Sequence, residues 1–132
     1  MADNNTLLST PQISIVIPLL NEEESLRELF EKTKKVMQGA NYTFEMLFVD
    51  DGSTDRSWQV ITELASDYPD EVRALRHYRN YGKSAALQNG FECVKGQIVI
   101  TMDADLQDDP EELPAMIERI KNGAHLVSGW KK

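Results

Sequence analysis

Residues 98–112 read Ile98-Val99-Ile100-Thr101-Met102-Asp103-Ala104-Asp105-Leu106-Gln107-Asp108-Asp109-Pro110-Glu111-Glu112. The stretch begins as a short, largely apolar run and then breaks into carboxylates. From residue 103 to residue 112 there are six acids in ten positions and neither Lys nor Arg, so no neighbour in sequence neutralises the negative charge. We therefore expect a cation to bind at this loop.

Apolar runs of the same kind recur along the chain. Residues 13–17 are β-branched and almost continuously apolar, which is typical of a strand buried on both faces of a parallel sheet, and Pro18 is expected to end it. The run at 72–76 is weaker, because its alternation turns Arg73 outward, as at a sheet edge. Strands are predicted at 13–17, 44–49, 72–76 and 97–102, and the start of a fifth at 124–128.

Amphipathic segments separate these strands. Glu22–Glu24 would lie in the first turn of the first helix and Lys32, Lys34 and Lys35 in its last turns, where both charges suit the helix dipole. Asp109 and Glu112 are spaced like a capping box at the start of the last helix. Helices are predicted from Asn21, as N-cap, to a closing Gly39; from the 50–55 loop to Tyr68; from the end of the 77–83 loop to Gly96; and from Pro110 or Pro114 to Asn122.

This alternation predicts a three-layer α/β fold with a mainly parallel sheet, in which residues 1–12 form an N-terminal arm and residues 13–132 one domain. Each unusual polar cluster follows a predicted strand, at 18–22, 50–55, 77–83 and 103–109. In such folds ligands bind beyond the carboxyl ends of the strands, near the point where the strand order reverses. We therefore expect the four clusters to form one site.

Composition excludes several classes of function. The formal net charge of −8 disfavours non-specific binding to nucleic acid, although the residues outside 103–112 carry only −2 of it. Cys93 is the single cysteine and cannot form an internal disulfide. No signal-peptide pattern precedes the first strand, and the longest apolar-dominated run, 13–20, is far shorter than the roughly 20 residues that span a bilayer. These features predict a cytoplasmic protein.

Side chains in the acid loop could hold a divalent metal. If residues 103–107 continue as extended chain, Asp103, Asp105 and Gln107 point the same way, since side chains alternate along a strand. Three oxygen donors on one side suit Mg²⁺ or Mn²⁺, with phosphate oxygens and water completing the shell. The alternative is a solvated acidic loop with Asp109 as a helix cap, and this alternative is favoured for Asp108, Asp109, Glu111 and Glu112.

Other polar residues suit a nucleotide. Asp50 and Asp51 could accept hydrogen bonds from a base N–H or a ribose hydroxyl, while Gly52 allows a tight turn. Ser53, Thr54 and Asp55 could instead simply cap the next helix. Glu22 either faces the site or favours the start of the first helix. These alternatives stay open at this point.

Basic and other reactive residues are few near the expected site. Arg79 and Lys83 are the clustered cations there and could bind a diphosphate or an anionic acceptor; the alternative is simple solvent exposure. His77 and His125 lack the spacing of a zinc site or a catalytic triad. Cys93 lies beside a helix stripe and is expected to be inert.

Four segments together resemble family 2 glycosyltransferases of GT-A type, above all bacterial polyprenyl-phosphate glycosyltransferases and dolichyl-phosphate mannosyltransferases. The resemblance covers nearly the whole chain, and four motifs in the right order make it specific. The segments are Ile15-Val16-Ile17-Pro18-Leu19-Leu20-Asn21-Glu22, Val49-Asp50-Asp51-Gly52-Ser53-Thr54-Asp55, Arg79-Asn80-Tyr81-Gly82-Lys83 and Asp103-Ala104-Asp105-Leu106-Gln107-Asp108-Asp109-Pro110-Glu111.

The resemblance implies roles for individual residues. Asp103 and Asp105 would hold Mg²⁺ or Mn²⁺ and the diphosphate, with Gln107 assisting. Leu20 stands where many relatives carry an aromatic, and Asp108-Asp109-Pro110 replaces the commoner Asp-Pro-Pro. The implied nucleotide-binding residues are Pro18, Leu20, Glu22, Asp50, Asp51, Lys83, Asp103 and Ala104, with Arg79 and Lys83 as diphosphate or acceptor contacts.

The resemblance also implies a reaction. The donor would be a nucleotide sugar, UDP-linked rather than GDP-linked, and the acceptor a lipid phosphate attacked with inversion at the sugar; no general base is identified. Relatives continue past a segment like Val127-Ser128-Gly129-Trp130 into acceptor-binding parts, so we expect these 132 residues to bind donor with little transfer of their own. The full-length protein is expected at the cytoplasmic face of the membrane, with sugar and oligomeric state undetermined.

Three rival functions remain. A phospho-receiver is also a small acidic α/β domain, but it carries its acidic pair after the first strand, where this chain has Pro18-Leu19-Leu20-Asn21-Glu22. A nucleotidyltransferase normally carries a Gly-rich phosphate loop at that place, which this sequence lacks. A non-catalytic nucleotide-binding module would keep the fold, but the presence of Asp103, Asp105 and Gln107 argues against it.

Overall fold

A four-stranded parallel sheet forms the centre of the structure, a computed structural model that describes residues 10–122. The strands are β1 (Ile13–Leu19), β2 (Phe44–Asp50), β3 (Val72–Arg76) and β4 (Ile98–Thr101), in the order β3-β2-β1-β4. Every pairing between them is parallel. The predicted fold class is therefore confirmed, and the strand order reverses between β1 and β4.

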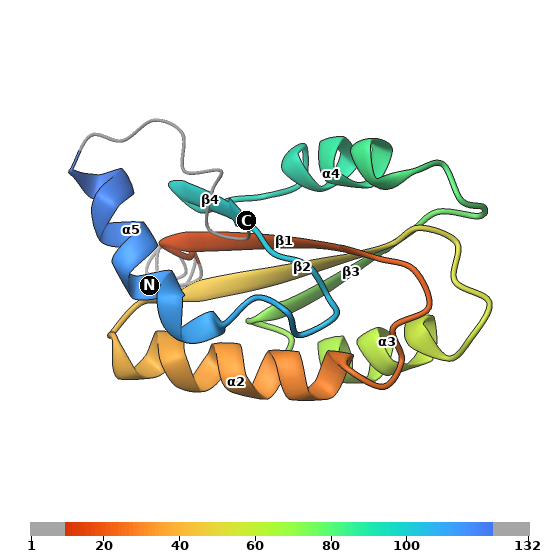
Figure 1. Cartoon of the computed structure of the whole chain (residues 1–132), viewed down its shortest axis with the longest axis horizontal. Helices are drawn as coiled ribbons and strands as arrows, with labels where there is room; N and C mark the ends of the chain where they lie inside the picture. The colour runs from red at the N-terminus through yellow and green to blue at the C-terminus, as the bar shows by residue number, and fades with distance from the viewer. Residues whose placement is uncertain (1–9, 123–132) are drawn as a thin grey trace, which may run out of the picture.

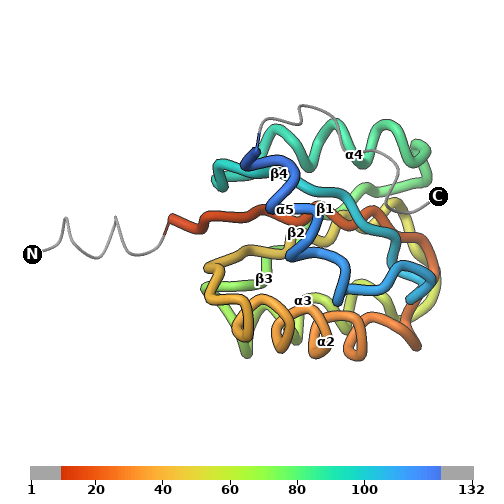
Figure 2. Tube along the Cα trace, turned by 60° about the vertical axis from the view of Figure 1, so that its left-hand side comes forward, coloured from red at the N-terminus to blue at the C-terminus, as the bar shows by residue number. Residues whose placement is uncertain are grey.

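Helices cover both faces of this sheet. Helices α2 and α3 lie on one face and α4 on the other (Figure 1), and the view in Figure 2 shows the sheet between these layers. The last helix, α5, packs with α2 and follows a single 3₁₀ turn, η1. The bounds are α2 (Leu26–Gly39), α3 (Ser57–Asp67), α4 (Lys83–Phe91), η1 (Pro110–Glu112) and α5 (Leu113–Lys121).

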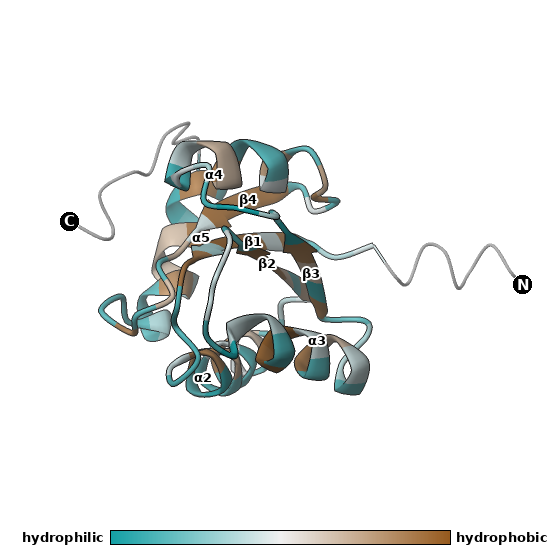
Figure 3. Ribbon diagram, turned by 90° about the vertical axis from the view of Figure 1, so that its right-hand side faces the viewer, coloured by the Kyte–Doolittle hydropathy of each residue, from teal (hydrophilic) through white to brown (hydrophobic). Residues whose placement is uncertain are grey.

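Alternation along the central strands divides the core in two. On β1, Ile13, Ile15 and Ile17 belong to the large cluster beneath α2 and α3, whereas Val16 belongs to the smaller cluster beneath α4. Successive side chains of a strand point to opposite faces, so a strand that is apolar throughout supplies both clusters. Figure 3 shows this as hydrophobic strands between helices with more hydrophilic outer surfaces.

The start of the first helix differs from the prediction. Helix α2 begins at Leu26 with Ser25 as its N-cap, so Asn21 is not the N-cap and Glu22–Glu24 precede the helix. Asn21 has a left-handed backbone (φ 56°), and its side-chain oxygen accepts the backbone N–H groups of Thr54 and Asp55. The side-chain oxygen of Asn21 therefore accepts from a segment more than 30 residues away and does not cap helix α2.

The ends of two helices and the first strand also differ. Gly39 is the last residue of α2, and Asn41 (φ 63°) takes the left-handed position expected of Gly39. No basic residue lies in the last turn of α2. Strand β1 continues one residue past Pro18, and β4 covers 98–101 rather than 97–102.

Helix α4 ends at Phe91 and not at Gly96, because buried polar groups hold the following segment. The backbone N–H groups of Lys95 and Gly96 donate to Glu45 and Ser14, at 2.8 and 2.7 Å. Arg73 on the edge strand β3 also donates to Glu45, at 2.9 Å. The predicted edge position of Arg73 is thus confirmed, and the side chain of Phe91 stays 47% exposed instead of joining the core.

Several predictions fall on residues outside the described range. These are the fifth strand at 124–128, His125 and most of the N-terminal arm. Within residues 10–122, Gln12 already bonds to Thr43 at the start of β2. None of the helices in that range has the length and apolarity needed to cross a bilayer.

Candidate functional site

A cavity of about 360 Å³ opens at the carboxyl ends of the strands, where the chain leaves β1 and β4. It lies at the reversal of strand order, the position at which α/β sheets bind ligands. Of the predicted site residues, the cavity brings together eight, from four separate segments of the chain: Pro18, Leu20, Glu22, Asp51, Lys83, Asp103, Ala104 and Asp105. Three further residues complete its lining: Leu19, Asn80 and Gly82.

Three predicted site residues do not line this cavity. Asp50 is fully buried at the end of β2, and its Oδ1 accepts the N–H of Ser53 at 2.8 Å, so it builds the turn beneath the site. The Arg79 guanidinium lies 5.7 Å from the ring centre of Tyr81. Gln107 lines a different cavity, beside helix α2.

The position of Gln107 follows from a turn in the acid loop. The chain turns at residues 104–106, where Leu106 has a left-handed backbone (φ 66°), and the N–H of Gln107 folds back to Oδ1 of Asp105 at 3.1 Å. The expectation that 103–107 continue as extended chain is therefore wrong. Asp103 and Asp105 face one cavity and Gln107 the other.

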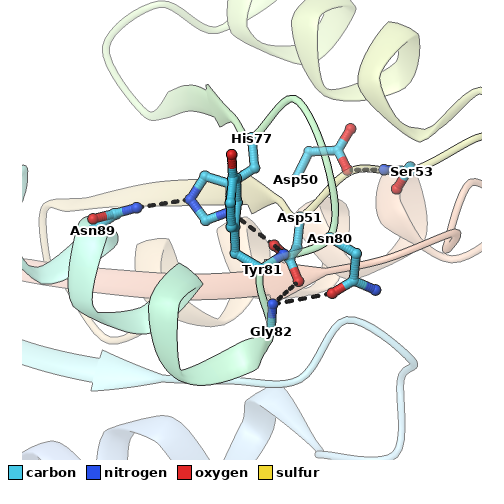
Figure 4. Close-up of polar contacts among 8 residues, drawn as sticks. All are labelled: Asp50, Asp51, Ser53, His77, Asn80, Tyr81, Gly82 and Asn89. Atoms are coloured by element: carbon cyan, nitrogen blue, oxygen red, sulfur yellow. Dashed lines mark hydrogen bonds and ion pairs between the residues drawn. The ribbon is translucent and has the colours of Figure 1, made fainter.

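Asp51 is held by the loop that follows β3. Its Oδ1 lies 2.8 Å from Nδ1 of His77 and accepts the N–H of Tyr81 at 2.9 Å, while its Oδ2 accepts the N–H of Gly82 at 2.9 Å (Figure 4). Burial raises the pKa of Asp51, but the hydrogen bonds outweigh it and the pKa is lowered overall. Asp51 is thus a fixed carboxylate anion at neutral pH.

Gly52 makes this close approach possible. It has a left-handed backbone (φ 89°), and a Cβ at this position would lie only 2.6 Å from the carbonyl carbon of Arg79. A side chain here would therefore push the 77–82 loop away from Asp51.

The hydrogen bonds leave Asp51 little room for a ligand. A carboxylate has about four acceptor positions, two on each oxygen. Within residues 10–122, both positions of Oδ1 are taken by His77 and Tyr81, and one position of Oδ2 by Gly82. One acceptor position therefore remains, on the residue that lines the cavity.

Carboxylates crowd the opposite wall of the cavity. The pKa of Glu22 is raised, first by burial and then by the negative charge of Asp105, with smaller effects of Asp55 and Asp103. A bound cation would relieve this repulsion. Lys83 supplies part of the positive charge, since its Nζ lies 3.0 Å from Oδ1 of Asp103.

The donor set fits a hard divalent cation that a ligand helps to hold. Among the described residues, no three His, Cys, Asp or Glu side chains are grouped to hold a metal by themselves. Mg²⁺ commonly binds through one or two carboxylates plus substrate phosphates, so Asp103 and Asp105 with a diphosphate would satisfy it. The loop is supported from below, because Ser25 Oγ donates to the carbonyl of Ala104 at 2.5 Å.

The other acids of the loop have structural contacts. Asp109 caps η1 by accepting the N–H of Glu111 at 3.0 Å, which confirms its capping role, although its partner is Glu111 and not Glu112. Asp108 is buried, with 8% exposed, and its Oδ2 accepts the N–H of Asp103 at 3.2 Å. The prediction that Asp108 is solvated is therefore wrong, because the buried side chain supports the backbone of the site at Asp103.

Two polar residues near the site were not predicted. His77 contacts Asp51, and Asn89 on α4 lies 2.7 Å from Nε2 of His77. No spacing in the sequence joins residues 51, 77 and 89. The position of His77 directly after a strand was the available signal, since that places it at the ligand edge of the sheet.

Comparison with known proteins gives a consistent result. The family described as "Glycosyl transferase family 2" matches residues 14–131. The chain is 43% identical over 118 residues to the dolichol-phosphate mannosyltransferase of Pyrococcus furiosus, covering 89% of this chain and 32% of that protein. It is 44% identical over 115 residues to the undecaprenyl-phosphate 4-deoxy-4-formamido-L-arabinose transferase of Pectobacterium carotovorum, covering 87% of this chain and 35% of that protein. It thus spans about one third of each relative.

A solved structure has the same fold. A mannosyltransferase from Pyrobaculum calidifontis, in complex with GDP-Man and Mn²⁺, superposes with a TM-score of 0.62 and 25% identity. The match covers 72% of this chain and 28% of that one.

Proposed function

The chain belongs to glycosyltransferase family 2, and on that premise we propose that it binds a nucleotide-sugar donor through a divalent cation in the cavity at the carboxyl ends of β1 and β4. Its parallel sheet with flanking helices has the GT-A arrangement. One observation carries the proposal. A single cavity gathers two acid-loop carboxylates, a lysine and a fixed hydrogen-bond acceptor, from loops far apart in sequence.

Asp103 and Asp105 are the proposed ligands of Mg²⁺ or Mn²⁺. Support comes from their oxygen donors, from the raised pKa of Glu22 beside them, and from the Mn²⁺ in the solved mannosyltransferase. Gln107 is left out of the proposed set because it lines the other cavity. When bound, the cation would stabilise negative charge on the leaving diphosphate as a Lewis acid.

The remaining lining residues suit the rest of the donor. Lys83 carries a cation at the start of α4 and is proposed to contact the diphosphate. Pro18 and Leu20 offer an apolar wall, and Asp51 an acceptor, for the nucleoside. Ala104 has no side-chain polar group, so its contribution is proposed to be shape alone.

Uridine is the proposed nucleoside. Uracil presents one imide N–H, which matches the one acceptor position left on Asp51. Guanine presents two neighbouring donors, N1–H and the amino group, which pair with both oxygens of a carboxylate. His77 and Tyr81 already occupy both acceptor positions of Oδ1 of Asp51, so a contact of guanine to both oxygens is blocked. The GDP-Man in the solved mannosyltransferase belongs to that enzyme's own site.

Transfer of the sugar, with inversion, to a polyprenyl phosphate is proposed for the whole protein, acting at the cytoplasmic face of a membrane. Both relatives carry a lipid phosphate in their names. A phosphate monoester has a second pKa near about 6, so it is largely a nucleophilic dianion at neutral pH. Such an acceptor needs little help from a general base, and no described residue is assigned that role.

The proposal is tested by calorimetric titration of UDP and GDP, with and without Mn²⁺, into the wild type, Asp105→Asn and Asp109→Asn. We expect Mn²⁺-dependent binding with UDP tighter than GDP. Asp105→Asn should remove most of the Mn²⁺ dependence, whereas Asp109→Asn, which changes charge by the same amount at a helix cap, should keep it. Binding that is independent of metal and unaffected by Asp105→Asn would refute the metal assignment.

A further inference from the structure

A chain of three polar side chains, two of them buried, leads to the cavity. It connects Asn89 on α4, His77 after β3 and Asp51 after β2, over contacts of 2.7 and 2.8 Å (Figure 4). His77 is 8% exposed and Asp51 5% exposed. Of the three, only Asp51 is among the residues that line the cavity, so His77 and Asn89 would act on a ligand through Asp51.

The chemistry of the three groups sets the direction of the chain. The amide nitrogen of Asn89 has only N–H groups to offer, so Nε2 of His77 accepts. A neutral imidazole that accepts at Nε2 carries its proton on Nδ1. Nδ1–H then donates to Oδ1 of Asp51. Asn89 therefore selects the tautomer that binds the carboxylate.

This donor also fills the second acceptor position of Oδ1. Oδ1 receives both His77 and the N–H of Tyr81, and the Tyr81 ring packs edge-on against the His77 ring, with 5.4 Å between centroids and 80° between planes. Without His77, one position of Oδ1 would be open, while Tyr81 and Gly82 would still hold one position on each oxygen. The ligand would then meet an open position on both oxygens instead of a single one.

We infer that His77 and Asn89 are positioning residues that hold Asp51 with a single acceptor position toward the nucleoside. The inference rests on the proposed function, in which Asp51 contacts the base. It adds two residues to the determinants of base selection, although neither lines the cavity.

Four variants test it. His77→Leu removes both ring nitrogens, and His77→Asn keeps an N–H near the position of Nδ1. Asn89→Leu removes the donor that selects the tautomer, and the exposed neighbour Gln88→Leu is its matched control on α4. For each variant, calorimetry in Mn²⁺ measures the affinities for UDP, GDP and inorganic pyrophosphate, and near-UV circular dichroism confirms the fold.

We expect His77→Leu to bind UDP about tenfold more weakly, the order expected for losing a hydrogen bond to a charged group. Asn89→Leu should lose less, about threefold, because the ring can still donate from Nδ1 part of the time. Pyrophosphate affinity should stay within about twofold in all four variants, since pyrophosphate has no base. The ratio of UDP to GDP affinity should fall in His77→Leu and recover in His77→Asn.

Three results would overturn the inference. The first is equal weakening of UDP and pyrophosphate in His77→Leu, which indicates general damage to the site. The second is failure of His77→Asn to recover the UDP affinity. The third applies if His77→Leu does not fold, and is a folded Asn89→Leu that binds UDP as tightly as the wild type does. By contrast, a wild type that binds pyrophosphate as tightly as it binds UDP would refute the proposed nucleoside site itself.

Discussion

The Nζ of Lys83 lies 3.0 Å from Oδ1 of Asp103, so an ion pair joins the first residue of α4 to the loop after β4 across the cavity. The lysine side chain is 56% exposed and that of Asp103 26% exposed. This contact connects Lys83, which is proposed to bind the diphosphate, to Asp103, which is proposed to bind the metal. A metal cation bound at Asp103 would compete with Lys83 for this carboxylate. A bound diphosphate, being negatively charged, would attract both the metal cation and Lys83.

Replacing this lysine should therefore change two affinities in opposite directions. In Lys83→Met, Mn²⁺ alone should bind up to about fivefold more tightly, because an exposed ion pair contributes at most about 1 kcal/mol. UDP in saturating Mn²⁺ should bind about fivefold more weakly, through loss of a phosphate contact. Titrations of Mn²⁺ and of UDP check both values. Lys32→Met, which breaks the exposed pair with Glu28 on α2, is the control and should change neither. Parallel changes in Lys83→Met would contradict the competition.

The acids of the 103–112 loop should separate into two groups. Asp109→Ala removes the cap of η1 and should lower the free energy of unfolding by about 1 kcal/mol, while leaving Mn²⁺ affinity in the presence of UDP within about twofold. Asp105→Ala should do the reverse, with a large loss of Mn²⁺ affinity and a smaller loss of stability. Urea unfolding and Mn²⁺ titration measure the two effects. A loss of metal affinity in Asp109→Ala as large as in Asp105→Ala would mean that the loop binds metal by bulk charge alone.

Glu22 should destabilise the metal-free protein at neutral pH. Burial and the charge of Asp105 raise its pKa above the ordinary 4.5, so the ionised form is disfavoured in the folded state. The destabilisation is present above the raised pKa and disappears as pH falls through it and Glu22 gains a proton. Glu22→Gln should therefore melt about 1–3 °C higher at pH 7 in EDTA, and this difference should shrink as the pH falls towards 4.5 and vanish below it. Thermal melts across this range test the prediction. Glu24→Gln, at an exposed position outside the cavity, should show neither effect.

Gly52 should be required for the approach of the 77–82 loop to Asp51. Gly52→Ala places a Cβ 2.6 Å from the carbonyl carbon of Arg79 at a left-handed backbone position, and should cost about 1–3 kcal/mol of stability and weaken UDP binding. Gly39→Ala is the matched control. Its Cβ would meet nothing within 4 Å at the last residue of the helix, so stability should rise by at most about 0.5–1 kcal/mol. Urea unfolding and UDP titration compare the two, and equal behaviour would disprove the close contact.

Much of the fold could be predicted because burial leaves a local pattern. Strand β1 is almost continuously apolar, and that pattern identified it as a strand buried on both faces of a parallel sheet. Arg73 interrupts the pattern in β3, which proved to be the edge strand. Helix ends were predicted less well, because Asn21 and Lys95 bond to residues distant in sequence that compete with local capping.

The candidate site divides in the same way. Eight predicted residues line one cavity because a parallel sheet brings the carboxyl ends of its strands to one edge, so residues that follow strands meet whatever their spacing. Gln107 departs from the prediction because a left-handed residue at Leu106 turns the loop, and no alternation rule applies through a turn.

The sequence by itself therefore determined the alternation of strands and helices, the burial of β1 on both faces, and the four loops that carry the chemistry, because each depends on neighbours within a few residues. Only the tertiary structure decided which atoms those loops present. The link from Asn89 through His77 to Asp51 and the ion pair between Lys83 and Asp103 join residues 12 to 26 positions apart. Such contacts exist only after the strands have paired, since pairing brings their ends within hydrogen-bonding distance.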